Sequence, residues 1–265
     1  SQLWSPAVCD AVWIVNYPST VRILWVHNGM LLPANAGGRI RTVFTLRELA
    51  RRHEVNVLSS YRAAAVDTQY EERLQAEFPD AQAVHLGGPW SWGGVARAVR
   101  LLSRVPDVVR EASSPSLALT VAEHLKSGEF DVAVCDFFES AVNFPQRPEI
   151  PVVLFEHNVE WELMRLQSPL APSLRERIAI SIESRRLRAL EAGAVSRFVH
   201  TVAVSEEDAA ALRALAGHSR VTAIPTGVDL ATYRPSVIPT TGAPTVAPAP
   251  RFSPSRRTPF RSPVR

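Results

Sequence analysis

Short apolar runs alternate with segments of helical spacing along most of this chain. The first run, Val21 to Val26, is almost continuously apolar, which is typical of a strand buried on both faces. Further runs suited to strands lie at residues 55–59, 83–86, 132–135, 151–155, 198–204 and 221–224. Because strand and helix alternate regularly, the pattern indicates βαβ units. The sequence therefore predicts an α/β fold with a Rossmann-like, doubly wound and mostly parallel sheet.

The connecting segments carry apolar residues at helical spacing. In the first of them these residues are Ile40, Val43, Phe44, Leu46, Leu49 and Ala50. Further helices are expected at about residues 67–78, 95–111, 116–126 and 205–215. The last of these begins with a capping box formed by Ser205 and Asp208. A long helix is expected from about residue 173 to 193, with an apolar side marked by Ile178, Ile182, Leu187 and Leu190.

Two terminal segments do not follow this pattern. Residues 1–20 show no clear period and end in Pro18, Ser19 and Thr20, so we expect an irregular extension. They are either an added edge strand around AVWIV or, because no initiator methionine is present, a poorly fitting extension of a natural start near Val21. Residues 236–265 are rich in proline and arginine, a composition that cannot build a packed core. We therefore expect a folded domain at residues 21–235, followed by a disordered tail.

The net charge of +3 and the pI near 9.2 suggest a nucleic-acid partner until the charges are located. From Arg234 onward there are six arginines and no acidic residue, and removing these six from the 29 basic residues leaves 23 against 26 acidic ones. The predicted domain is therefore slightly acidic, and we expect no nucleic-acid partner. The tail can touch RNA or anionic lipid, but unstructured filler is the simpler interpretation.

The sequence also bears on the compartment of the protein. Cys9 and Cys135 are far apart and have no CxxC or zinc spacing, which favours a reducing compartment such as the cytoplasm. No apolar run approaches the roughly 18 residues that a membrane-spanning helix needs. Contact with the membrane surface from the cytoplasmic side is left open.

Candidate binding residues stand at the start of the first helix. Gly37 and Gly38 precede the helical pattern directly, and two glycines let a ligand approach the backbone closely. Free N–H groups at a helix start attract anions or sugar hydroxyls. The alternative is that the pair forms only a tight turn.

Polar residues also follow two of the predicted strands. Asp136 ends one of them, where it either binds a hydroxyl group or caps a helix that starts near Phe137. Glu156, His157 and Asn158 follow the next strand. A histidine there can hydrogen-bond a substrate oxygen or move a proton near neutral pH, and the alternative is a structural histidine. Trp90 and Trp92 either stack on a sugar ring or, more simply, cover the core edge.

Five motifs occur together in one order: PANAGGRIRTVFTLRELARRHEV, FDVAVCDFFES, PVVLFEHNVEWELMRL, TVAVSEEDAAAL and VTAIPTGVDLATYRP. Over about residues 21–235 this combination resembles the amino-terminal domain of glycosyltransferase family 4, whose members are retaining enzymes of the two-domain GT-B fold. The resemblance implies transfer of a sugar from a nucleotide-sugar donor to an acceptor glycan, lipid or small molecule, as in polysaccharide biosynthesis. It implies no cofactor and no metal.

The resemblance also implies roles for residues of this chain. Gly37 and Gly38 match the glycine loop that faces the donor diphosphate, and Arg39 is placed to meet the phosphates. His157 matches the catalytic-cleft histidine that hydrogen-bonds the sugar, while Glu156 and Asn158 shape the acceptor side. Asp136 and Ser205 are the weaker matches among the substrate-binding residues.

The chain departs from the family after Pro235. The family's second domain binds the nucleotide-sugar through an E-x7-E motif, but no acidic residue follows Pro235 here. We therefore expect a truncated glycosyltransferase that is inactive alone. The alternatives are a non-catalytic module that binds carbohydrate or acceptor and, third, an NAD-type Rossmann oxidoreductase, although no GxGxxG follows the first strand.

Overall fold

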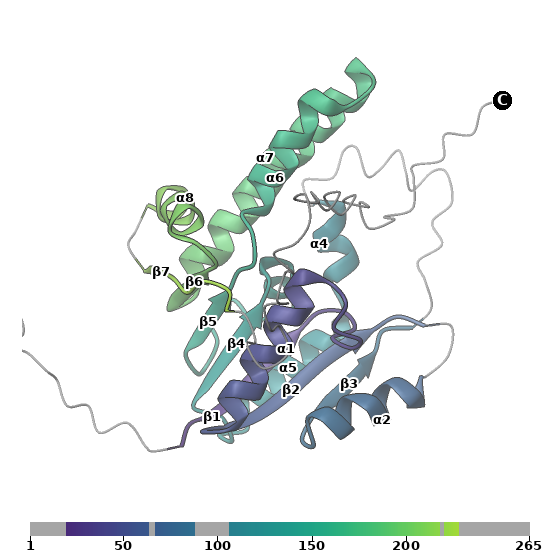
Figure 1. Cartoon of the computed structure of the whole chain (residues 1–265), viewed down its shortest axis with the longest axis vertical. Coiled ribbons are helices and arrows are strands. Elements are labelled where there is room, and N and C mark those ends of the chain that lie inside the picture. Colours follow the sequence, from purple (N-terminus) through teal and green to yellow (C-terminus); the bar gives the residue numbers. More distant parts are fainter. Residues whose placement is uncertain (1–19, 64–66, 88–105, 218–219, 228–265) are drawn as a thin grey trace, which may run out of the picture. The chain divides into compact units, whose positions relative to one another are not determined.

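Seven parallel strands form one sheet in the described part of the chain, which comprises residues 20–63, 67–87, 106–217 and 220–227 of this computed structural model (Figure 1). The strands are β1 (Arg22–His27), β2 (Glu54–Tyr61), β3 (Gln82–His85), β4 (Val132–Asp136), β5 (Val152–Phe155), β6 (His200–Ala203) and β7 (Val221–Ala223). Their spatial order is β3-β2-β1-β4-β5-β6-β7. The predicted Rossmann-like, doubly wound parallel sheet is confirmed.

The helices between these strands begin and end with clear local signals. They are α1 (Gly37–Ala50), α2 (Thr68–Glu77), α4 (Asp107–Ala112), α5 (Pro115–Lys126), α6 (Glu160–Gln167), α7 (Leu174–Arg197), α8 (Glu206–Ala216) and the short 3-10 helices η1 (Phe138–Asn143) and η2 (Ser168–Leu170). The side chains of Asp67, Ser114, Ser173 and Ser205 each cap a helix start by accepting a backbone N–H bond. Gly217 ends α8 in the left-handed region, at φ 71°.

Helices cover both faces of the sheet. On one face, α1 and α2 bury side chains such as Val43, Leu46 and Leu74 against Trp25 of β1. On the other face, α5, α7 and α8 pack on residues that include Leu24 and Cys135. Because both faces are covered, the strands are apolar on both sides, as their continuous runs predict.

The strand order places a topological switch point between β1 and β4. From β1 the chain winds outward through β2 and β3, returns to β4, and then winds the other way through β5, β6 and β7. The helices that follow β1 and β4 therefore lie on opposite faces. Doubly wound sheets bind their ligands at such a switch point.

Some expectations need correction. The helix α6 at residues 160–167 was not among the expected helices. The helix expected to start near Phe137 is the short 3-10 helix η1. The predicted apolar side of the long helix is only partly buried: Leu187 is in the core, but Ile178 and Ile182 are exposed. The reason is that only the second half of α7 contributes residues to the core.

Several expectations lie outside the described residues. They concern the irregular extension apart from Thr20, the residues Trp90 and Trp92, the helix at residues 95–105 and the tail at residues 236–265. Among the described helices, none is both long enough and apolar enough to cross a lipid bilayer.

Candidate functional site

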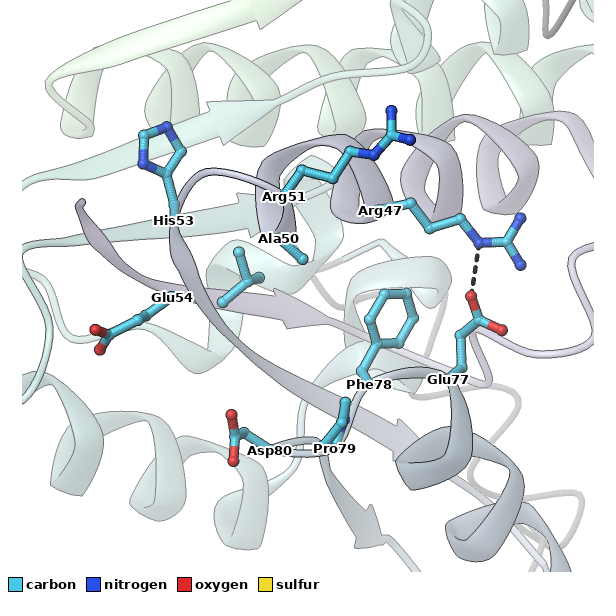
Figure 2. Close-up of a pocket in the computed structure, with 10 residues that line it drawn as sticks. Arg47, Ala50, Arg51, His53, Glu54, Glu77, Phe78, Pro79 and Asp80 are labelled. Carbon is cyan, nitrogen blue, oxygen red and sulfur yellow. Dashed lines mark hydrogen bonds and ion pairs between the residues drawn. The ribbon is translucent and has the colours of Figure 1, made fainter. Parts of the chain in front are cut away.

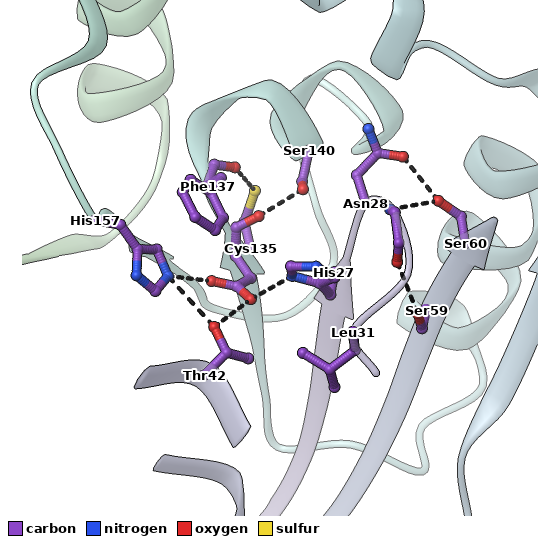
Figure 3. A network of polar contacts seen from close by, with 12 residues as sticks. His27, Asn28, Leu31, Thr42, Ser59, Ser60, Cys135, Phe137, Ser140 and His157 are labelled. Carbon is purple, nitrogen blue, oxygen red and sulfur yellow. Dashed lines mark hydrogen bonds and ion pairs between the residues drawn. The ribbon is translucent and has the colours of Figure 1, made fainter. Parts of the chain in front are cut away.

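The carboxylate of Asp136 is the centre of a buried polar network at the carboxyl edge of the sheet (Figure 3). Its Oδ2 atom lies 2.6 Å from Nδ1 of His27 and accepts a hydrogen bond of 2.9 Å from the Thr42 hydroxyl. Its Oδ1 atom lies 2.8 Å from Nε2 of His157. All four side chains are buried. The network therefore joins two histidines and one helix through a single carboxylate.

The strand register explains why these residues meet. His27 and Asp136 are paired positions at the ends of the neighbouring strands β1 and β4. His157 follows β5, which pairs with β4 on its other side, and Thr42 comes from the second turn of α1. The network therefore lies at the switch point of the sheet, where a ligand site is expected.

The charge of Asp136 fixes the protons of both histidines. Burial alone would raise the pKa of Asp136, but the electrostatic attraction of His27 and the hydrogen bonds from His157 and His27 hold it well below its usual range. An ionised carboxylate only accepts hydrogen bonds. His27 therefore donates from Nδ1, and His157 donates from Nε2. Nδ1 of His157 forms no hydrogen bond within the described residues, and the side chain is 3% exposed.

The Nδ1 edge of the His157 ring faces the start of α1, where Gly38 packs closely against Phe137. Phe137 stacks on His157 with ring centroids 3.9 Å apart and an angle of 18° between the planes. A Cβ atom built on Gly38 would lie 2.6 Å from Cζ of Phe137 and 3.6 Å from Nδ1 of His157. A Cβ on Gly37 would meet nothing within 4 Å. Gly38 is therefore required by packing, whereas Gly37 is not.

Phe137 itself has an unusual backbone. Its φ angle is 66°, the only positive φ of a non-glycine residue among those described, and a bulky residue rarely adopts this conformation. The chain turns sharply here, directly after Asp136. The turn places the Phe137 ring over His157 and lets Ser140 donate a hydrogen bond of 2.5 Å to the Asp136 carbonyl.

A second set of hydrogen bonds fixes the loop between β1 and α1. Ser60 accepts a hydrogen bond of 2.9 Å from the Gly29 N–H and donates one of 2.8 Å to the Asn28 side chain (Figure 3). Ser59 donates one of 2.8 Å to the Gly29 carbonyl, and the Leu31 N–H donates one of 3.0 Å to the Tyr70 hydroxyl. The loop that leads to Gly37 is thus held against β2.

The structure brings only some of the predicted site residues together. Asp136, His157 and Gly38 converge, with Gly37 beside them. Arg39 donates a hydrogen bond of 3.3 Å to the Pro33 carbonyl, and the Asn158 side chain donates one of 3.3 Å to Glu160. Ser205 caps α8 by accepting a hydrogen bond from the Asp208 N–H. The Asp208 carboxylate accepts from the Ser205 hydroxyl instead of its backbone N–H, so half of the predicted capping box is present. The alternative that Asp136 caps a helix is wrong, because its carboxylate binds the two histidines and Thr42.

Glu156 lies next to His157 in sequence, but its carboxyl group is buried on the other side of the chain. Burial, together with the charges of Glu191 and Glu139, raises its pKa well above the usual value. It makes no side-chain hydrogen bond of good geometry among the described residues. Arg41 reinforces this segment, because it donates hydrogen bonds of 2.8 Å to the Glu156 carbonyl and 2.9 Å to the Ile224 carbonyl.

Sequence reasoning missed His27, Thr42 and Phe137. The signal for His27 was present, because it closes the first apolar run just as Asp136 closes the fourth. Thr42 stands among the predicted apolar positions of α1 and gave no signal of its own. Phe137 directly follows Asp136, but its positive φ could not be read from the residue type.

A hollow of about 460 Å³ lies elsewhere, at the end of α1 and the start of β2 (Figure 2). It is lined by Arg47, Ala50, Arg51, His53, Glu54, Val55, Glu77, Phe78, Pro79 and Asp80, and Arg47 forms an ion pair of 2.6 Å with Glu77. These residues are at the amino ends of the strands, the edge opposite to Asp136. The hollow is therefore separate from the candidate site.

Comparisons with known proteins found one family model and several solved structures that resemble this chain. The sequence model of glycosyltransferase family 4 matches residues 36–232. No curated protein sequence matches the chain. Among solved structures, HepE of Anabaena in complex with UDP-glucose is similar over 82% of this chain and 47% of its own, with 14% identity and a TM-score of 0.43.

A second solved structure is a UGT transferase of Siraitia grosvenorii in complex with UDP. It is similar over 79% of this chain and 52% of its own, with 11% identity and a TM-score of 0.40. The chain thus spans about half the length of each of these two structures.

Proposed function

Because the chain belongs to glycosyltransferase family 4, we propose that it forms the acceptor-side half of an enzyme that transfers a sugar from a nucleotide-sugar donor to an acceptor glycan, lipid or small molecule. The transfer proceeds with retention of configuration, as the resemblance implies. The observation that carries the proposal is the placement of His157 against Gly38 at the switch point, with its ring held by Asp136.

The geometry supports a division of labour among the site residues. The Asp136 carboxylate orients His157, and Nδ1 of His157 is available to hydrogen-bond a sugar hydroxyl. The N–H groups at the start of α1, with the partial positive charge of the helix end, stabilise the departing diphosphate. Arg39, in the first turn of α1, swings from its weak contact with Pro33 toward the phosphates. Together these groups hold donor and acceptor in a reactive arrangement.

Three predicted substrate-binding residues take a lesser part in this proposal. Asn158 is exposed beside the site and lines the acceptor side. Ser205 and Glu156 act through the structure, since the first caps α8 and the second is buried. Nucleotide recognition belongs to a second domain in the family resemblance. The described residues form only the acceptor-side domain, so we expect a protein of these 265 residues alone to transfer no sugar.

The test is an assay of sugar turnover with labelled UDP-glucose and GDP-mannose. We expect the chain alone to release no labelled sugar above a His157→Ala variant. When the donor domain of a complete family member is added as a separate chain, transfer should appear, and His157→Ala should lower it on the order of 10²-fold. His124→Ala, on α5 and outside the site, is the matched control. Turnover by the chain alone above the His157→Ala variant, or complemented transfer that does not depend on His157, would overturn the proposal.

A further inference from the structure

The segment from α6 to α7 is a helical hairpin with exposed aliphatic side chains at its tip. We call residues 160–197 the hairpin. Around η2, Leu166 is 54% exposed, Leu170 is 83% exposed and Leu174 is 73% exposed. A fully exposed leucine is common, but several together on one tip form a surface that soluble proteins usually cover.

The aliphatic surface continues along the outer side of α7. Leu174, Ile178, Ile182, Arg185 and Ala189 follow one another at intervals of three or four residues, and all are exposed. Such spacing places them on one face of the helix. We call these five residues the outer stripe. The carboxyl-terminal end of the stripe borders a shallow hollow lined by Ile182, Arg185, Arg186, Ala189 and Leu190.

The hairpin extends beyond the packed core. In Figure 1, α6 and α7 run side by side away from the sheet, and η2 lies at their far end. No residue of α6 is fully buried, and α7 adds Leu187, Ala194 and Val195 to the core, all from its second half. Among the described residues, the first half of α7 and the tip therefore present exposed side chains.

Basic residues surround the exposed leucines and isoleucines. Arg165 lies near the end of α6, where it pairs with Glu162 at 3.1 Å, and α7 carries Arg175, Arg177, Arg185, Arg186 and Arg188 before its core-packed end. The outer stripe itself contains no acidic residue. Glu176 and Glu183 are on the other side of α7, where Glu183 pairs with Arg186 at 3.5 Å, and Glu191 is buried.

An aliphatic face bordered by arginines fits an anionic lipid surface. Aliphatic side chains enter the boundary between headgroups and acyl chains, while guanidinium groups bind lipid phosphates. Arginine binds phosphate through a planar fork of donors. A symmetric pairing of two copies along the outer stripe would instead bring the arginines of the copies toward each other, which disfavours self-association.

We propose that the hairpin docks this protein on the surface of an anionic lipid bilayer, with the tip leucines and the outer stripe in the interfacial layer. α6 begins two residues after Asn158, so the hairpin starts at the edge of the sheet that holds His157. This proposal does not rest on the proposed function. The hairpin would bind the bilayer even if the protein transferred no sugar.

Sedimentation with lipid vesicles tests the proposal. We expect binding to vesicles of phosphatidylcholine with about 30% phosphatidylglycerol, little binding to phosphatidylcholine alone, and loss of binding at high salt. The double variant Leu170→Ser with Leu174→Ser should lower the partition coefficient roughly tenfold or more. Arg175→Ala with Arg185→Ala should lower it by roughly the same factor.

Leu119→Ser provides the matched control, because Leu119 is 65% exposed on α5, away from the hairpin. We expect it to bind vesicles like the parent protein, and thermal unfolding of every variant should match the parent because the changed side chains are exposed. Equal binding to both vesicle types, no binding to either, or an equal loss from Leu119→Ser would overturn the proposal. A dimer in sedimentation velocity that Leu170→Ser with Leu174→Ser dissociates, without lipid binding, would assign the surface to a second copy and also overturn it.

Discussion

Replacement of Gly38 by alanine should disturb His157 through Phe137. The added methyl group would lie 2.6 Å from Cζ of Phe137, whereas carbon atoms pack at about 3.5 to 4.0 Å. The Phe137 ring must therefore move by roughly 1 Å. Because this ring stacks on His157 at 3.9 Å, the shift removes part of the packing that holds the imidazole ring.

The expected free-energy change combines two effects. Overpacking of this kind costs about 1 to 3 kcal/mol, and alanine in a helix is favoured over glycine by about 0.5 to 1 kcal/mol. Gly38→Ala should therefore be destabilised by about 0.5 to 2 kcal/mol. Gly37→Ala is the matched control, because a Cβ there meets nothing within 4 Å. Only the helix effect remains for it, so it should be neutral or slightly stabilised.

Urea unfolding of the two variants measures this difference, and the imidazole signals of His157 in NMR spectra report the local change. We expect Gly38→Ala to lower the unfolding midpoint and shift the His157 signals. Gly37→Ala should leave the midpoint unchanged or slightly raised and should leave the His157 signals in place. Equal stability of the two variants, or unchanged His157 signals in Gly38→Ala, would refute the packing argument.

Two further predictions concern buried carboxyl groups. Asp136→Ala should lower the free energy of unfolding by about 3 to 5 kcal/mol because two buried histidines lose their partner. Asp131→Ala, which breaks an exposed ion pair with Arg22, should lower it far less in the same urea experiment. The pKa of Asp136 is depressed in the folded protein, so its contribution is present above its ordinary pKa and is lost as the pH falls. If the free energy of unfolding falls equally with decreasing pH in the parent and in Asp136→Ala, this would contradict the prediction. The pKa of Glu191 is raised to about 7 mainly by burial, so its contribution is present below its ordinary pKa near 4.5 and is lost as the pH rises to about 7, a change on the order of 3 kcal/mol. Glu191→Gln should weaken this dependence without removing it, because the pKa of buried Glu156 is also raised. A constant stability difference from the parent across this range would argue against it.

The sequence predicted the sheet well because buried parallel strands are long apolar runs. Each of the seven runs became a strand, and Asp136 and His157 stand at strand ends as expected. The sequence of a strand does not determine which strands lie next to it in the sheet. The pairing of His27 with Asp136 could therefore not be predicted from the sequence. It appears only when β1 and β4 are placed side by side.

Glu156 and the hairpin show two other limits. Side chains alternate along extended chain, so Glu156 and His157, as neighbours, cannot both face the site. This alternation could have predicted that only one of them does. The apolar spacing of Ile178 and Ile182 indicated a helix but not a buried face, because spacing alone does not say what lies against it.

The central claim is that a sugar binds where His157 meets the start of α1. The most direct measurement is a two-dimensional amide and imidazole NMR titration with UDP-glucose and GDP-mannose at millimolar concentration. The account predicts saturable shifts that cluster at Gly37, Gly38 and His157 and that are absent in the Asp136→Ala variant after its fold has been verified. Shifts confined to the hollow around His53, or no shifts with either probe, would contradict it.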